Sequence, residues 1–98
     1  MVGGGTRNIR RESLGLPVPF EPPEGDLETA IAAIFANVFG IDQVGANDEF
    51  FDLGGDSLLA EVLRMRLAEH TSHEIPLSSF LENDSPRRIA AFLTTGML

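Results

Sequence analysis

Apolar residues recur every three or four positions from residue 26 onward, which is the spacing of one face of an α-helix. The first such stretch opens at Asp26, which we expect to cap the helix, and stops at Gly40. We therefore predict a first helix between these two residues. Its apolar face comprises Leu27, Ile31, Ile34, Phe35 and Val38.

A second stretch with helical spacing runs from about Ser57 to about His70. Leu58 and Met65 lie on the flank of its apolar stripe, next to the start of the helix. The stripe itself comprises Leu59, Val62, Leu63 and Leu67, which we expect to be core residues.

The end of the chain predicts a last helix, because Ser85 is a good cap and Pro86 is a favourable first residue. This helix is expected to bury Ile89, Phe92 and Leu93, and residues 76–81 can form a short helix before it. No stretch has the alternation of a strand. The fold class predicted is all-α, a small four-helix bundle of three main helices and one short helix.

Residues 41–56 separate the first two helices and have no regular periodicity. Loops of this length in small domains are usually functional or packed by their own side chains. Phe50, Phe51 and Leu53 are the residues expected to anchor it. We therefore predict an ordered loop.

The first 25 residues are rich in glycine and proline, which is typical of a flexible tail or linker. We predict a tail or linker over residues 1–25, a domain over 26–94 and a short tail over 95–98. A domain of this size has a marginal core, and without cysteine it must be stabilised by packing alone.

Charge is distributed unevenly along the chain. From Glu12 onward, fifteen acidic side chains against four basic ones leave a net charge of about −11. Such a surface repels nucleic acid and favours basic partner surfaces, although it also serves solubility. The chain has neither a run of about 20 apolar residues nor a secretion signal, so we expect a monomer in the cytoplasm, without a membrane partner.

The segment with candidate chemistry is Asp52-Leu53-Gly54-Gly55-Asp56-Ser57-Leu58. The two glycines leave the backbone open to close approach by another molecule, and Ser57 is placed at the first turn of a helix with its hydroxyl exposed. A phosphodiester on that oxygen would be favoured by the positive end of the helix dipole. The plainer interpretation is that Asp56 or Ser57 only caps the helix.

A hydrolase reaction at Ser57 lacks a general base. His70 lies thirteen residues along the same helix, about 20 Å away at 1.5 Å per residue. The sequence after Ser57 also lacks the second glycine of a nucleophile elbow. Ser57 is therefore better interpreted as the substrate of another enzyme.

The stretch Phe50-Phe51-Asp52-Leu53-Gly54-Gly55-Asp56-Ser57-Leu58 resembles the phosphopantetheine-attachment motif of peptidyl carrier (thiolation) domains in nonribosomal peptide synthetases, which are related to acyl carrier proteins. The resemblance extends from Leu27 to Leu93. Two places depart from the family pattern. Thr71-Ser72-His73 replaces the usual apolar-glycine-apolar turn, and residues 7–14 resemble the segment after an adenylation domain but lack its lysine.

The resemblance implies that Ser57 carries 4'-phosphopantetheine transferred from coenzyme A by a phosphopantetheinyl transferase. The thiol of the arm would hold an aminoacyl or peptidyl group, and the protein itself would catalyse nothing. Gly55, Asp56 and Leu58 would surround the attachment point, and Asp56 would help to position the transferase and metal-bound coenzyme A. An adenylation enzyme would load the arm, and condensation, tailoring or thioesterase domains would unload it.

Partner enzymes are expected to dock on an edge formed by Leu58, Glu61 and Met65, although scattered surface apolar residues are common. Two metal sites are rejected. Asp48, Glu49, Asp52 and Asp56 lack calcium-loop spacing and are expected to be solvated, and His70 and His73 lack a third ligand. Two alternatives stay open, which are an acyl carrier of a polyketide pathway and a non-catalytic helical interaction module.

Overall fold

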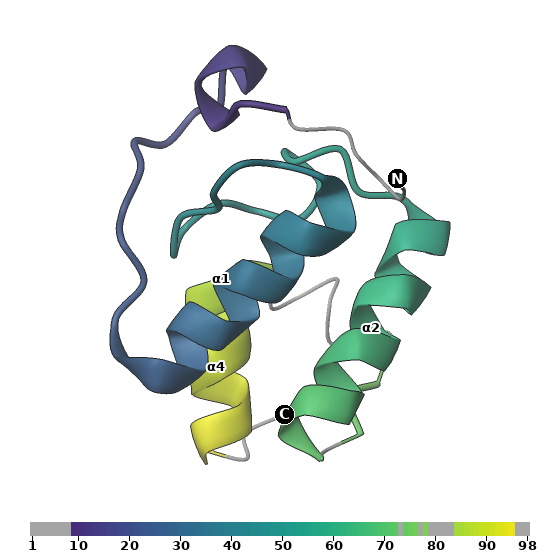
Figure 1. Cartoon of the computed structure of the whole chain (residues 1–98). Coiled ribbons are helices and arrows are strands. Elements are labelled where there is room, and N and C mark those ends of the chain that lie inside the picture. The colour runs from purple at the N-terminus through teal and green to yellow at the C-terminus, as the bar shows by residue number, and fades with distance from the viewer. Residues whose placement is uncertain (1–8, 73, 77, 79–83, 96–98) are drawn as a thin grey trace.

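The computed structural model describes residues 9–72, 74–76, 78 and 84–95. These residues form a 3-10 helix, η1 (Arg11–Leu14), and three α-helices, α1 (Gly25–Phe39), α2 (Ser57–Thr71) and α4 (Pro86–Thr95) (Figure 1). Within the described ranges the only extended pairing is an isolated bridge between Ile9 and Ile41. The all-α prediction is confirmed, and the short helix predicted at residues 76–81 lies largely outside the described residues.

The first helix ends where its sequence predicts but begins differently. Gly40 adopts the left-handed conformation, and its N–H donates to the carbonyl of Ala36, as is usual at a helix C-terminus. The residue that precedes the helix is Glu24, which makes no side-chain cap. The prediction that Asp26 caps the helix is therefore wrong. Asp26 lies in the first turn, where its negative charge still complements the helix dipole.

The second helix begins at Ser57 and ends one residue later than predicted, at Thr71. The departure from the family pattern at Thr71-Ser72 produces an unusual end. Ser72 is the only non-glycine residue with positive φ in the described part of the chain, at 61°, and its N–H donates to the carbonyl of Ala68. A serine therefore occupies the left-handed position that glycine normally takes.

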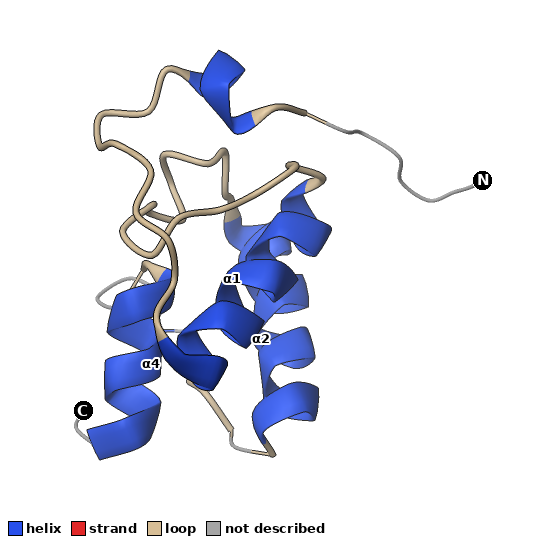
Figure 2. Cartoon of the chain, turned by 60° about the vertical axis from the view of Figure 1, so that its left-hand side comes forward, coloured by secondary structure: helices blue, strands red, loops and turns tan. Residues whose placement is uncertain are grey.

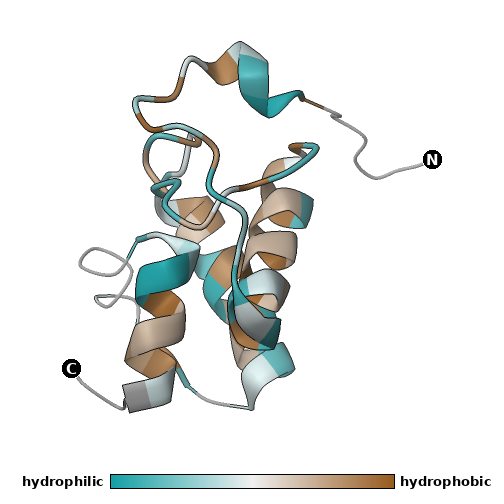
Figure 3. Cartoon of the chain, turned by 90° about the vertical axis from the view of Figure 1, so that its left-hand side faces the viewer, coloured by the Kyte–Doolittle hydropathy of each residue, from teal (hydrophilic) through white to brown (hydrophobic). Residues whose placement is uncertain are grey.

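The three helices enclose one hydrophobic core. Each of them alternates hydrophobic and hydrophilic segments along its ribbon, as amphipathic helices do (Figure 3). Residues of the three helices supply most of the core, the loop between α1 and α2 adds to it, and Ile75 contributes from the segment after α2. Leu63 and Leu67 are buried as predicted, whereas Val62, also predicted as a core residue, is only half-buried. The core comprises Ile31, Phe35, Phe39, Ile41, Val44, Phe50, Leu53, Ala60, Leu63, Leu67, Ile75, Ile89 and Ala90, with Leu27, Ile34, Val38, Leu59, Phe92 and Leu93 packed against it.

The loop over residues 41–56 is ordered, as predicted, and crosses one end of the helices (Figure 2). Phe50 and Leu53 are buried, and the N–H of Phe50 donates to the carbonyl of Asp84 at 2.7 Å. Phe51 was expected to be a third anchor, but its side chain is 51% exposed. Its ring packs edge-on against the Phe50 ring instead, with centroids 5.1 Å apart.

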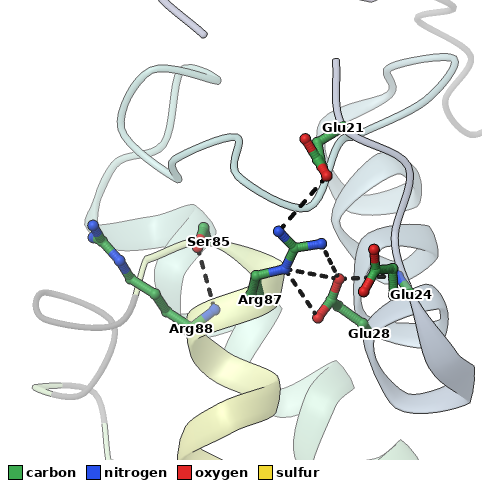
Figure 4. A network of polar contacts seen from close by, with 6 residues as sticks. All are labelled: Glu21, Glu24, Glu28, Ser85, Arg87 and Arg88. Atoms are coloured by element: carbon green, nitrogen blue, oxygen red, sulfur yellow. Dashed lines mark hydrogen bonds and ion pairs between the residues drawn. The ribbon is translucent and has the colours of Figure 1, made fainter. Parts of the chain in front are cut away.

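The last helix is held by both local and distant contacts. Ser85 caps it as predicted, accepting a hydrogen bond from the N–H of Arg88. Arg87 extends from α4 to Glu28 of α1, with 3.1 Å between Nη2 and Oε1, and lies 3.9 Å from Glu21 (Figure 4). The bond to Glu28 raises the pKa of the Arg87 guanidinium above its ordinary value. This arginine therefore joins three segments of the chain.

The segment before α1 differs from the sequence expectation. The sequence predicts a tail or linker up to residue 25, whereas the structure folds residues 9–24 across the loop and along the helices (Figures 1 and 2). Arg11 is buried in this segment. No helix in the described part of the chain has both the length and the apolar character needed to cross a bilayer.

Candidate functional site

Ser57 lies at the junction between the loop and α2. It is the first residue of that helix, and its side chain is exposed. The N–H groups in the first turn of a helix have no carbonyl partner within the helix, so this end carries a partial positive charge. The predicted position of an accessible hydroxyl at a helix N-terminus is confirmed.

Asp56 caps the helix that carries Ser57. Its Oδ1 accepts a hydrogen bond from the N–H of Leu59 at 2.9 Å, and its carbonyl accepts from the N–H of Ala60 at 2.8 Å. The plainer interpretation of this residue, a helix cap, is therefore correct for Asp56. The cap leaves the hydroxyl of Ser57 free for another role, because the capping oxygen comes from its neighbour.

The two glycines before Asp56 serve different purposes. Gly54 has a φ of 100°, a conformation that side chains rarely adopt, so the turn itself requires it. Gly55 has an ordinary φ, but a Cβ built on it would overlap three atoms of the Phe50 ring. The glycine at position 55 therefore admits a buried ring of the same chain, in addition to any approach by another molecule.

Phe50 contacts both the turn before Ser57 and the core. Its carbonyl accepts a hydrogen bond from the N–H of Gly55 at 3.0 Å, and its ring packs edge-on against Phe39 of α1 at 5.5 Å. The backbone that leads into Ser57 is thus fixed to the core through one aromatic side chain.

The apolar residues predicted beside Ser57 are exposed. Leu58 is 72% exposed and Met65 is 51% exposed, and they lie seven residues apart on one face of α2. Phe51 is a third exposed apolar residue in the same stretch of chain, although the sequence indicated it as an anchor of the loop. Its exposure depends on the path of the loop, which periodicity does not reveal.

Glu61 lies between Leu58 and Met65 on α2 and is already paired. Arg64 donates to its Oε2 at 2.6 Å, and this hydrogen bond lowers the pKa of the Glu61 carboxyl. The carboxyl therefore stays ionised at neutral pH. Because both groups are partly exposed, the pair stabilises the helix only slightly.

The acidic residues of the loop are not all solvated, contrary to the sequence expectation. The carboxylate of Asp48 is buried and accepts two hydrogen bonds from Arg11, both at 2.6 Å. Its Oδ2 also accepts from the N–H of Gly45 at 2.7 Å. The sequence pattern does not reveal this pair, because the partners are 37 residues apart.

The hydroxyl of Ser57 is placed to accept a group, and the one histidine in the described part of the chain lies far from it. His70 lies near the other end of α2 from Ser57, too far to act as its base. Ser57 is followed in the chain by the exposed Leu58 and preceded by Asp56, whose carboxylate caps the helix. The arrangement fits an acceptor hydroxyl that is approached from solvent.

Known proteins are similar to this chain in sequence and in fold. A family model described as "Phosphopantetheine attachment site" matches residues 29–93. Tyrocidine synthase 3 of Brevibacillus parabrevis is 33% identical over 98 aligned positions, which cover 91% of this chain. The matched region is 2% of that synthase, so the chain spans a very small part of its length.

Two solved structures have the same architecture. The structure described as "Non Ribosomal PCP domain" is 35% identical, with a TM-score of 0.67 over 72% of this chain and 91% of that one. A chain of the phosphopantetheine transferase Sfp complex with coenzyme A and a peptidyl carrier protein is 25% identical. Its TM-score is 0.74, and the match covers 78% of this chain and 99% of that one.

Proposed function

This chain belongs to the phosphopantetheine-attachment family, and we propose that Ser57 is the residue to which the group is joined. The chain is a peptidyl carrier domain, which holds biosynthetic intermediates as thioesters and is not itself an enzyme. Family membership also excludes the alternative of a plain helical interaction module. The observation that carries the assignment is an exposed serine hydroxyl at the N-terminus of α2, after a capping Asp56.

The surroundings of Ser57 fit a phosphodiester. The positive end of α2 favours an anion there, and the first-turn N–H groups of Ser57 and Leu58 have no helical acceptor. Asp56 opposes the anion by its charge, but its oxygen is held toward Leu59 in the cap. When bound, the group supplies a terminal thiol on which acyl groups are carried.

The attachment step requires an outside enzyme. The Oγ of Ser57 forms a P–O bond to phosphopantetheine while the pyrophosphate bond of coenzyme A breaks, and adenosine 3',5'-bisphosphate leaves. The proton of the hydroxyl passes to a base of the transferase, since His70 cannot reach it. This role makes the chain a substrate of a phosphopantetheinyl transferase. A chain of the Sfp complex with coenzyme A and a peptidyl carrier protein has the same fold.

We further propose that the partners are those of a nonribosomal peptide synthetase. These are an adenylation enzyme that loads the thiol, and condensation, tailoring or thioesterase domains that use the cargo. The exposed side chains of Leu58 and Met65, with Glu61 between them, are the docking edge beside Ser57. The cytoplasm, where coenzyme A and ATP are available, is the proposed location.

Mass spectrometry tests the assignment of Ser57. The chain is incubated with coenzyme A, magnesium and a transferase of broad specificity. We expect the wild type to gain one phosphopantetheine and Ser57→Ala to gain none. A modified Ser57→Ala variant, or an unmodified wild type, would refute the assignment. Loading by adenylation enzymes, rather than by acyl transferases, would distinguish a peptidyl carrier from the acyl carrier of a polyketide pathway.

Two substitutions separate the structural and recognition roles of Asp56. Asp56→Asn keeps an oxygen for the cap, whereas Asp56→Ala removes it and should cost about 1 kcal/mol of stability. If the charge helps to position the transferase, both variants will be modified more slowly than wild type. Equal rates for Asp56→Asn and wild type would restrict Asp56 to capping.

A further inference from the structure

Arg11 fastens the segment before α1 to the loop that leads to Ser57. Its Nε and Nη2 donate to the two oxygens of Asp48, both at 2.6 Å, and Nη2 also donates to the carbonyl of Val18. The two side chains are 9% and 1% exposed. A bidentate pair that is shielded from water is stronger and more directional than a surface pair.

Backbone hydrogen bonds extend this attachment on both sides of Arg11. The N–H of Ile9 donates to Gly40 at 2.8 Å, and the N–H of Asp42 donates back to Ile9 at 2.7 Å. Farther along, the N–H of Ala46 donates to the carbonyl of Glu21 at 2.8 Å. The segment thus follows the loop over residues 40–48.

Apolar residues of the segment line a pocket together with residues of the turn before Ser57. This pocket of about 380 Å³ is lined by Ile9 and Leu14 of the segment together with Leu53, Gly54 and Leu59. Gly54 and Leu59 flank Ser57 in the chain. The segment is therefore close to both ends of the loop, and the family model, which begins at residue 29, does not include it.

A short series of contacts in the loop connects Asp48 with Ser57. Asp48 lies two residues before Phe50, whose ring and carbonyl hold Gly55. Gly55 is followed by the cap residue and by Ser57. A shift of the loop at Asp48 consequently moves the support of the turn that presents the hydroxyl.

From these contacts we propose that Arg11 is a positioning residue for the modification of Ser57. By pairing with Asp48 it docks residues 9–24 and holds the loop in the form that the transferase recognises. This inference rests on the proposed function of Ser57. If the docked form falls to about one third of the molecules, the apparent affinity for the transferase weakens about threefold, while turnover of the bound complex is unchanged.

The variant that tests this role must stay folded without the pair. Arg11→Met alone leaves the buried carboxylate of Asp48 without its cationic partner and can unfold a small domain. Arg11→Met/Asp48→Asn removes the charge as well, and the side-chain amide at position 48 keeps an oxygen for the N–H of Gly45. Arg10→Met is the matched control, because Arg10 is adjacent, 71% exposed and paired only with the exposed Glu12 within the described residues.

Two measurements are made on each full-length variant at a temperature where circular dichroism shows it folded. The first is kcat and KM of a phosphopantetheinyl transferase with the carrier as varied substrate. The second is amide hydrogen exchange by mass spectrometry. We expect the double variant to show a KM raised about threefold, an unchanged kcat and faster exchange over residues 42–46. Arg10→Met should match the wild type in all three.

An unchanged KM in the double variant would overturn the proposal, whether or not exchange increases. An equal rise in KM for Arg10→Met would also overturn it, by assigning the effect to charge alone. Failure of the proposed function is distinguishable, since the wild type would then not be modified at Ser57.

Discussion

Gly55 and Ser57 are two residues apart but have different roles in the site. Ser57 offers an exposed hydroxyl, and Gly55, two residues earlier, has no room for a side chain above the Phe50 ring. The carbonyl of Phe50 binds the N–H of Gly55, so the glycine and the ring form one unit. The geometry of the attachment turn is set by this contact.

Substitution of Gly55 by alanine should destabilise the domain. The added methyl group would overlap the Phe50 ring, and overpacking of this kind costs about 1–3 kcal/mol. Urea unfolding followed by far-ultraviolet circular dichroism measures the loss, because the chain has neither Trp nor Tyr. In a Phe50→Leu background the smaller side chain leaves space, so the same substitution should cost less. An equal cost in both backgrounds would contradict the contact.

For single residues, the sequence predicts which ones belong to the site better than it predicts the contacts that require them. Ser57 and Asp56 are recognisable because capping and the glycine turn are local signals. The reason for Gly55 is not recognisable, since its contact with Phe50 depends on how the loop curves. The exposure of Phe51 is not predicted for the same reason, since phenylalanine is more often buried than exposed.

The helices are defined mainly by signals at their ends. Gly40, Ser85 and Pro86 terminate or start helices where the sequence predicts, because each acts on its own turn. The start of α1 is the exception. Glu24 precedes the helix, and its N–H binds Glu28 at 3.0 Å, so a side chain one turn later takes the place of the predicted Asp26 cap.

Ser72 offers a test of the unusual end of α2. A left-handed residue other than glycine is strained by about 1–2 kcal/mol. Glycine removes this strain, but its greater conformational freedom in the unfolded chain cancels part of the gain in stability. We expect Ser72→Gly to raise the free energy of unfolding by up to about 1 kcal/mol. Ser72→Ala, which keeps the Cβ, should bring no such gain in the same urea titration. A gain of equal size in both would show that the backbone conformation is not the cause.

Across the whole molecule, the pairing of Arg11 with Asp48 is the contact that sequence patterns could not reveal. The residues are 37 positions apart, and neither lies in a stretch with a hydrophobic repeat. Proline and glycine around residues 15–25 predict an extended segment, but not where it lies. The burial of opposite charges against one another depends on the completed fold.

The pair should show strong coupling in stability measurements. Arg11→Met leaves the buried Asp48 carboxylate without its cationic partner, and such losses are about 3–5 kcal/mol. Adding Asp48→Asn to that variant should restore part of the stability, because the unpaired charge is removed. The free energies of unfolding of wild type, both single variants and the double variant give the coupling. Additive losses would show that the two side chains act independently.

The pH dependence of the pair follows from the same contact. The hydrogen bond to Asp48, together with the carboxylate charge, raises the pKa of Arg11 above its already high ordinary value. A raised pKa in the folded state contributes stability that is complete below the unfolded value and is lost only as the pH rises through the folded one. The guanidinium therefore remains charged throughout the neutral range.

The docking of residues 9–24 bears on how carrier units are transplanted between synthetases. A graft cut at residue 25 or 29, where the first helix or the family match begins, would separate Asp48 from its cation and Ala46 from Glu21. A junction upstream of Ile9 would transfer both contacts intact. Hybrid synthetases joined upstream of Ile9 should receive the phosphopantetheine arm faster than those joined at residue 25 or 29.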